Sequence, residues 1–330
     1  MPPKELYSIE CLDDQVPAIK PVSQLPMLAK PICGEALPGW LHRFAGELHL
    51  PPSQLLLDAE EGELPSDDTW WRNPPLELVA RIAARTGAEV TVLNTMTFGD
   101  WEIDRCTDEV MRRFSRGRVR GTLPACVTRR YGVCAMCLAT DDVPYVRREW
   151  TLGWVVACER HGMRLNETCR YCWQGYMLPF LKHRTDFGVH RCWRLDSALA
   201  DQPKVPAHPA AQRLQRALFS GRAARSVSLA SVGTLSWASA IGLIDSILRT
   251  AWTPVDSLLH RRCYQSLAQE LDYQGVLKGS CHDGLTIASW VLDDWPGRLL
   301  WLTKKLGLPE PEFHKRWSGD KNHCPSLDLG

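Results

Sequence analysis

The chain has 330 residues, of which 45% are hydrophobic and 23% are charged, with a formal net charge of +1. This length accommodates two or three domains with real cores, and the near-neutral charge does not single out a dedicated reader of duplex DNA. No run of about eighteen apolar residues is present, and the N-terminus lacks the apolar region of a signal peptide, so we expect a cytoplasmic protein without a membrane segment.

The first predicted elements are an extended arm, residues 1–33, and a helical domain, residues 34–122. The domain opens with "GEALPGWLHRFAGELHL", in which apolar residues recur at helical spacing and Pro38 suits a first turn. We expect Trp40 and Phe44 of this helix either to pack in the chain's own core or to meet a second copy of the chain at a dimer interface, because large aromatic residues often anchor interfaces.

A helix, a glycine turn and a second helix are predicted in "PPLELVARIAARTGAEVTVLNTMTF". Leu76, Val79 and Ile82 lie on one helical face, and Gly87 stands where a tight turn requires a positive φ. This pattern fits a helix-turn-helix unit, and it fits equally well an αα-hairpin that serves only the core.

Local charge is uneven although the total is near zero. Residues 58–68 contain six acidic residues, whereas residues 110–140 contain none. We predict that the arginines of the second stretch contact phosphate groups of nucleic acid, since each neutralised phosphate releases a counterion; a solvated loop that balances the acidic stretch is the alternative. These arginines are Arg112, Arg113, Arg116, Arg118, Arg120, Arg129 and Arg130.

Six of the thirteen cysteines lie between residues 134 and 192, within a predicted tandem zinc-ribbon module, residues 123–196. An odd number of cysteines without a secretion signal argues against a disulfide framework. The spacing Cys134-x2-Cys137, followed after twenty residues by Cys158-x2-His161, is typical of two knuckles whose four ligands surround one zinc ion.

The segment between these knuckles is long enough for a β-hairpin. Trp150, Leu152, Trp154 and Val156 alternate along it, as in a half-buried strand.

A second ligand set begins with Cys169-x2-Cys172. His190 and Cys192 are the predicted third and fourth ligands, although only one residue separates them, and His183 is an alternative. A second zinc ion is therefore expected if this set is complete; otherwise the cysteine pair is the remnant of a motif.

The first set predicts a structural role for zinc. Four protein ligands leave no open coordination position, and the sequence contains none of the common zinc-hydrolase, deaminase, phosphate-loop or serine-hydrolase motifs. Nearby acidic residues are interpreted as solvated surface groups. We therefore expect no catalytic residue and no enzymatic activity; a zinc hydrolase would require zinc that can be removed without unfolding the module.

Residues 197–330 are predicted to form a helical C-terminal domain after a proline-rich linker. "SWASAIGLIDSILRTAW" carries one apolar face, and "DDWPGRLLWLTKKLG" places acidic residues before its helix and basic residues at its end. The predicted fold class is mainly α with small zinc-ribbon β elements: a helix-turn-helix N-terminal domain, a tandem zinc ribbon and a helical C-terminal domain.

The stretch "CAMCLATDDVPYVRREWTLGWVVACERHGMRLNETCRYC" closely resembles the zinc-ribbon region of TniQ-family transposition proteins. The shared features are a C-x2-C-L knuckle, an acidic pair, a P-Y-x-R-x-x-W segment, and C-x2-H-x3-L before a further C-x2-C. The family's E-x-L-x-x-W-L-x-R-x-A helix is matched by Glu35, Leu37, Trp40, Leu41, Arg43 and Ala45. One departure is that "HRC" stands where relatives commonly close the second zinc site with another cysteine knuckle.

This resemblance implies a non-enzymatic, cytoplasmic target-selection factor of a bacterial transposon that recruits the transposon's AAA+ ATPase. Some relatives bind attachment-site DNA directly, and others dock, often as a dimer, on a CRISPR RNA-guided Cascade complex. The chain's size and charge favour the docking version. Direct sequence-specific DNA binding in transposition is one alternative. A zinc-containing transcription regulator is another, but the predicted second helix offers few base-reading side chains.

Overall fold

The computed structural model describes residues 25, 29–49, 74–98, 130–168, 170, 176–177, 202–251, 257–273, 277 and 280–306. These residues form two compact units. The first unit comprises the described residues up to 98 together with Tyr145–Arg148, and the second comprises all the others. The boundaries of the four segments predicted from the sequence stay a prediction. Each unit is described by itself.

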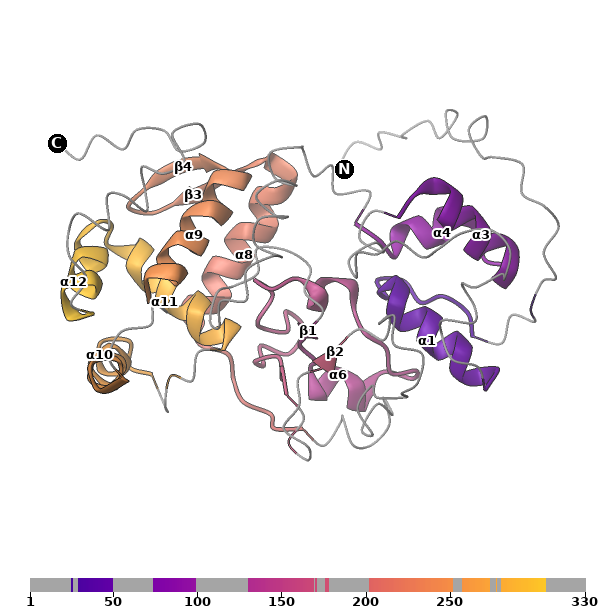
Figure 1. Cartoon of the computed structure of the whole chain (residues 1–330), viewed down its shortest axis with the longest axis horizontal. Helices are drawn as coiled ribbons and strands as arrows, with labels where there is room; N and C mark the ends of the chain where they lie inside the picture. Colours follow the sequence, from indigo (N-terminus) through magenta and orange to yellow (C-terminus); the bar gives the residue numbers. More distant parts are fainter. Residues whose placement is uncertain are drawn as a thin grey trace, which may run out of the picture. The chain divides into compact units, whose positions relative to one another are not determined.

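The first unit is built around α1 (Leu37–Glu47), shown in indigo in Figure 1. Pro38 lies in its first turn, where a missing backbone N–H costs no hydrogen bond. The predicted apolar stripe is buried, and Trp40 and Phe44 are both 0% exposed within the single chain. Their rings lie 5.5 Å apart in a tilted arrangement, so the stripe serves the intrachain core.

The predicted helix, glycine turn and second helix are confirmed in the first unit. They are α3 (Leu76–Thr86) and α4 (Val90–Thr95). Gly87 ends α3 in the left-handed conformation, with φ 73°, and its N–H donates to the carbonyl oxygen of Ala83. A side chain at this position would be strained, which explains the glycine.

Tyr145–Arg148 belongs to the first unit although it lies between the two knuckles in sequence. The N–H of Ala36 donates to the carbonyl oxygen of Val146 at 2.9 Å, and the N–H of Arg148 donates to that of Gly34 at 2.8 Å. The segment therefore pairs with the backbone that leads into α1.

The knuckle region of the second unit has little regular structure. It contains the two-residue strands β1 (Arg130–Tyr131) and β2 (Tyr176–Met177), which pair antiparallel, and the short helix α6 (Ala135–Thr140). The predicted strand around Trp150 is wrong, because the 3₁₀ helix η4 (Arg148–Thr151) occupies its start. Residues 150–158 are all buried, so the apolar alternation does not separate a buried face from a solvated one.

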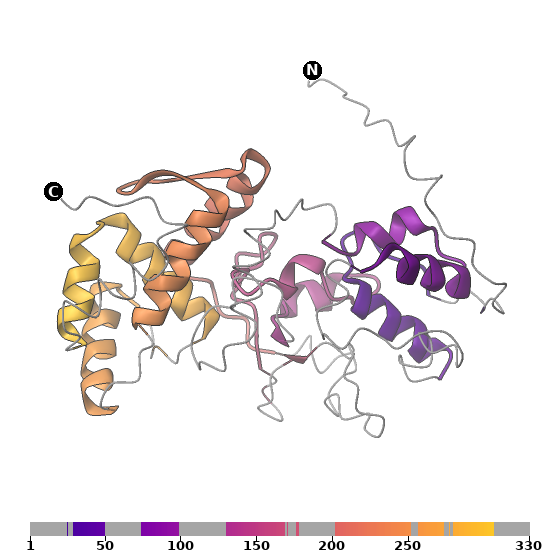
Figure 2. The same cartoon turned by 45° about the horizontal axis from the view of Figure 1, so that its top comes forward.

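The rest of the second unit is mainly helical, as predicted. Its helices are α8 (Pro209–Ala224), α9 (Trp237–Ala251), α10 (Ser257–Glu270), α11 (Cys281–Asp293) and α12 (Gly297–Lys305). Helix α11 packs against both α8 and α9, and the three form the centre of this group in Figures 1 and 2. None of the described helices combines the length and the apolarity that crossing a bilayer requires.

A β-hairpin between α8 and α9 was not predicted. It consists of β3 (Ser226–Leu229) and β4 (Gly233–Ser236), with Val227 opposite Leu235. Val227 and Leu229 are buried while Ser228 between them is exposed, which is the alternation that marks a strand. The signal was therefore present in "SVSL", but it is only four residues long.

Candidate metal centre

The first knuckle consists of Cys134 and Cys137 at the start of α6. Cys134 is the N-cap residue in extended conformation, and Cys137 lies within the first turn of the helix. Residues three apart on a helical turn lie on the same side, so both sulfur atoms reach one point. Both cysteines are 0% exposed.

The second knuckle is a tight turn that carries Cys158 and His161. The N–H of Gly162 donates to the carbonyl oxygen of Cys158, and the N–H of Cys158 donates to that of Met163, both at 2.8 Å. Gly162 has φ 63°, a conformation that glycine adopts without strain. The chain then returns alongside itself, with the N–H of Leu165 donating to the carbonyl oxygen of Val156 at 2.9 Å.

A close backbone contact joins the two knuckles. Val133 and Asn166 exchange two backbone hydrogen bonds of 2.9 and 2.8 Å. Gly132 lies so close to Leu165 that a Cβ atom at Gly132 would stand 2.6 Å from the Leu165 Cβ. Leu165 is 1% exposed, so it packs where a larger side chain at position 132 would not fit.

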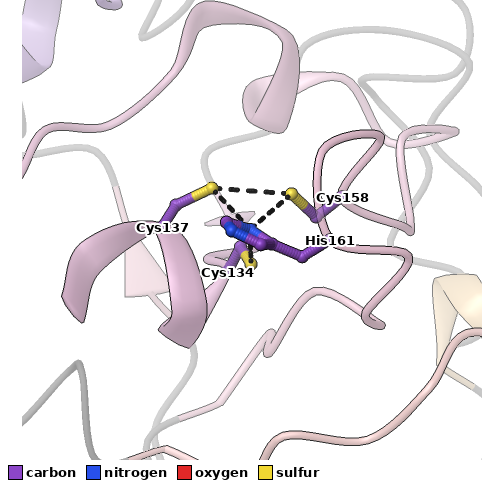
Figure 3. Close-up of side chains that lie close together, drawn as sticks. All are labelled: Cys134, Cys137, Cys158 and His161. Carbon is purple, nitrogen blue, oxygen red and sulfur yellow. Dashed lines mark hydrogen bonds between the residues drawn. The ribbon is translucent and has the colours of Figure 1, made fainter. Parts of the chain in front are cut away.

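Four donor atoms converge at this junction, as Figure 3 shows. The Sγ atoms of Cys137 and Cys158 are 3.5 Å apart, and the Nδ1 atom of His161 lies 3.2 Å from the Cys137 Sγ. All four ligand atoms, including the Sγ of Cys134, lie within 4.8 Å of one another. In a tetrahedral zinc site with metal–ligand distances of about 2.0–2.3 Å, donor atoms are about 3.3–3.8 Å apart.

The electrostatics of the cluster are those of thiols that share protons. Hydrogen bonds from Cys137 and Cys158 lower the pKa of the Cys134 thiol well below its ordinary value. Hydrogen bonds with Cys134 and Cys158, together with burial, raise the pKa of Cys137. A bound cation would favour the thiolate form at every cysteine of the set, which is why metal binding to such sites releases protons.

The residues therefore fit a tetrahedral ion with soft ligands. Three sulfur atoms and one imidazole nitrogen form a donor set that suits zinc, and four protein ligands leave no position for a substrate. Among the described residues this is the one group of three or more histidine, cysteine or acidic side chains placed to hold a metal. The cluster is compatible with a structural zinc ion.

The other predicted site residues lie almost entirely outside the described part of the chain. Arg130 begins strand β1, so its backbone is described. Outside the described residues are Arg112, Arg113, Arg116, Arg118, Arg120, Arg129, Cys169, Cys172, His183, His190 and Cys192. The second zinc set and the phosphate contacts stay predictions, as does a dimer interface at Trp40 and Phe44.

Two arginines have roles that the sequence analysis did not predict. Arg43 binds the buried carboxylate of Glu35 with both ends of its guanidinium, Nε at 3.1 Å and Nη2 at 2.7 Å. Arg148 donates from Nη1 to the carbonyl oxygens of Thr95 and Thr97 at 2.7 and 2.6 Å, at the C-terminal end of α4. The signal for the first pair was present, since Glu35 and Arg43 both belong to the helix motif.

Trp40 and the Glu35–Arg43 pair also fix the segment that precedes α1. The Nε1–H of Trp40 donates to the carbonyl oxygen of Ala29 at 2.8 Å, and Arg43 donates to that of Lys30 at 2.7 Å. The carboxylate of Glu35 accepts from the N–H of Ile32 at 3.2 Å. The motif residues thus tie residues 29–35 to the helix.

Fold and site together define a mainly helical protein built around a buried Cys3His cluster that can hold a metal. The TniQ family model matches residues 26–165, which extend from the segment before α1 to the end of the second knuckle. Over these residues, which make up less than half of its length, the chain is similar to the TniQ family of transposition-associated proteins. No curated protein matches the chain.

Proposed function

We propose that this protein is a non-enzymatic target-selection adaptor for DNA transposition. In this role it links a target-recognition complex, a CRISPR RNA-guided Cascade, to the transposon AAA+ ATPase. It acts as a homodimer in the cytoplasm of a bacterium. The observation that carries the proposal is the family match, which includes α1 and all four residues of the metal cluster.

The chemistry of the cluster supports a scaffold in preference to a catalyst. Three of its four residues are buried and the fourth, His161, is partly buried. Asp141, the carboxylate nearest the first knuckle in sequence, is paired with Arg160 at 3.2 Å. A catalytic zinc requires an open coordination position, and a set of four protein ligands fills the tetrahedron.

The first experiment separates an adaptor from a direct DNA reader. The zinc-loaded protein is titrated with random-sequence duplex DNA at about 50 mM and 200 mM salt, because phosphate contacts weaken steeply over this range. We expect no binding at either salt concentration. Tight, salt-sensitive binding would instead indicate a DNA-reading targeting protein, with the arginines at 112–130 as the first residues to replace.

The second experiment tests the partners directly. The full chain is co-expressed with the guide-RNA complex and, separately, with the AAA+ ATPase of one transposon, and the complexes are isolated through a tag on the partner. We expect each partner to retain the protein, and we expect its mass in solution to be that of a dimer. Retention by neither partner would contradict the adaptor role.

A further inference from the structure

The loop that carries the second knuckle is also the support on which α8 rests. Gln215 of α8 is 1% exposed, and its Oε1 accepts hydrogen bonds from the N–H groups of Val156 and Ala157 at 2.8 and 3.0 Å. Its Nε2 donates to the carbonyl oxygen of Ala157 at 2.9 Å. One buried side chain therefore satisfies three backbone groups directly before Cys158.

The residues after His161 are bonded to the chain that enters α8. The N–H of Ala207 donates to the carbonyl oxygen of Gly162 at 2.9 Å, and the N–H of Arg164 donates to that of Val205 at 2.8 Å. Nε2 of Gln212 also donates to the Gly162 oxygen, at 3.2 Å. The knuckle loop and the start of α8 are thus one hydrogen-bonded assembly.

The same loop reaches the N-terminus of α11. The carboxylate of Glu167 accepts from the N–H of Cys281, the first residue of the helix, at 3.2 Å. Arg164 lies 3.6 Å from the carboxylate of Asp283, which also accepts a hydrogen bond from the hydroxyl of Tyr273 at 2.5 Å. Asp283 is 0% exposed and completes a capping box with Ser280.

We propose that metal binding at the Cys134–Cys137–Cys158–His161 cluster controls the packing of α8 and α11. The bound ion fixes the knuckle turn, and the fixed turn presents residues 156, 157 and 162–167 to both helices. When the ion is removed the turn opens, the partners of Gln215 and of the α11 N-terminus move away, and buried polar groups lose their hydrogen bonds. The metal centre is then a conformational control for the C-terminal helices, independent of the proposed role in transposition.

Hydrogen exchange of the full chain, read by mass spectrometry, tests this coupling. The protein is compared with zinc and after treatment with a chelator, and peptides from α8 and α11 are followed beside peptides from α1 and α3. We expect amides of α8 and α11 to exchange about tenfold faster or more without zinc, with α1 and α3 unchanged. Unchanged α8 and α11, with fast exchange at residues 134–161, would overturn the proposal. Equal acceleration in all helices would also overturn it, since the effect would then be global.

Two variants in the zinc-loaded protein locate the coupling. Gln215→Leu removes the three hydrogen bonds with little change in volume, so α8 should exchange faster with zinc bound, and chelation should add little to the exchange of α8. Gln269→Leu, at an exposed glutamine of α10, is the matched control and should behave as the parent protein. A full chelation effect in Gln215→Leu would contradict the assigned route. If that variant does not fold, Gln212→Leu provides the same comparison.

Two cysteine variants distinguish the effect of losing the metal from the effect of replacing a cysteine. Cys158→Ser removes a ligand and should reproduce the exchange pattern of the chelated protein. Cys263→Ser changes a cysteine in α10 that is 2% exposed and lies outside the cluster, so it should leave the response to chelator intact. Loss of the response in Cys263→Ser, or its retention in Cys158→Ser, would be inconsistent with control by the metal centre.

Discussion

Helix α1 and the metal centre hold their segments of chain in place by different kinds of contact. In α1, aromatic and aliphatic side chains are fully buried, and one bidentate ion pair ties the preceding segment to the helix. In the metal centre, four ligand atoms from two knuckles meet within 4.8 Å, and the surrounding backbone has almost no regular secondary structure.

The difference shows that complete burial does not by itself specify a conformation. Residues 150–158 are all buried, yet they form neither a regular helix nor a strand. A helix satisfies its own backbone groups, whereas an irregular segment needs outside partners for each one. Gln215 supplies such partners to Val156 and Ala157, and the side chain of Cys158 joins the end of the segment to the metal cluster. The stability of this region should therefore depend on the ion, and that of α1 should not.

Removal of the metal should have the largest effect. Structural zinc contributes about 10 kcal/mol or more to small metal-dependent domains, which is comparable to the whole stability of a typical domain. We expect chelator to expose residues 134–144 and 149–161 to a protease while the peptide of α1 stays protected, together with residues 145–148 that pair with the segment before it. Mass spectrometry of the fragments reads this directly. If zinc is removed and no new protease cleavage follows, the result would contradict a structural role for zinc and favour a catalytic one.

Breaking the buried ion pair should have the next largest effect, and in the other region. Arg43→Gln leaves the carboxylate of Glu35, whose side chain is 1% exposed, without its cation. Removing one partner of a buried pair costs about 3–5 kcal/mol. We expect a loss near the lower end of this range in the free energy of unfolding by urea, because Arg43 itself is 16% exposed.

Two controls qualify the Arg43 result. Arg43→Lys keeps the positive charge but cannot form the two parallel hydrogen bonds of the guanidinium. Its free energy of unfolding should therefore lie between those of the parent and of Arg43→Gln. Arg216→Gln changes an exposed arginine of α8 and should be close to neutral. An Arg43→Gln protein as stable as the parent would show that the pair does not anchor the segment before α1.

A single methyl group placed between the two knuckles should have a smaller effect. Gly132→Ala forces a Cβ to within 2.6 Å of the Leu165 Cβ, and overpacking of this kind costs about 1–3 kcal/mol. Thermal unfolding of the zinc-loaded protein measures the loss. Gly242→Ala in α9, where a new Cβ meets nothing within 4 Å, is the control and should be neutral or slightly stabilising. Equal behaviour of the two variants would contradict the close packing of the knuckles.

The smallest predicted effect is a pH dependence of the free energy of unfolding, which arises from a histidine in α1. Burial lowers the pKa of His42 from 6.5 to about 4. Between these values the unfolded chain binds a proton at His42 that the folded chain does not. The contribution of His42 to the free energy of unfolding is therefore complete above pH 6.5 and is lost as the pH falls toward 4. Compared with the parent, His42→Gln should gain about 1 kcal/mol per pH unit over this range. Denaturant titrations at several pH values test it, and identical pH profiles would contradict it.

Short-range patterns explain what could be predicted from this sequence. The spacing Cys134-x2-Cys137 and Cys158-x2-His161 indicates a common centre because each knuckle is a local turn, and Gly87 indicates a left-handed helix end for the same reason. The structure places both as the patterns suggest. The helix motif with buried aromatic residues could be predicted equally well, because its apolar residues recur at helical spacing.

The remaining contacts could not be predicted because they join residues far apart in the chain. The bonds of Arg148 to Thr95, of Gln215 to Ala157 and of Cys281 to Glu167 span 53, 58 and 114 residues. No local periodicity signals such a pair. A polar residue on an apolar helix face was still a clue, since Gln215 lies between the buried Leu214 and Leu218. The strand expected around Trp150 failed because alternation also occurs by chance in a fully buried segment.

The placement of Tyr145–Arg148 in the first unit has a consequence for inheritance and for engineering. A chain cut anywhere between residues 98 and 145 would separate α1 from the Val146 oxygen that accepts from Ala36, and α4 from the Arg148 side chain at its C-terminal end. The N-terminal helices therefore cannot be transferred from one protein to another unless the segment with Val146 and Arg148 is transferred with them. Gene fusions should therefore be joined outside residues 98–148 if both units are to stay folded. Recombination between related genes should likewise be tolerated only outside this range.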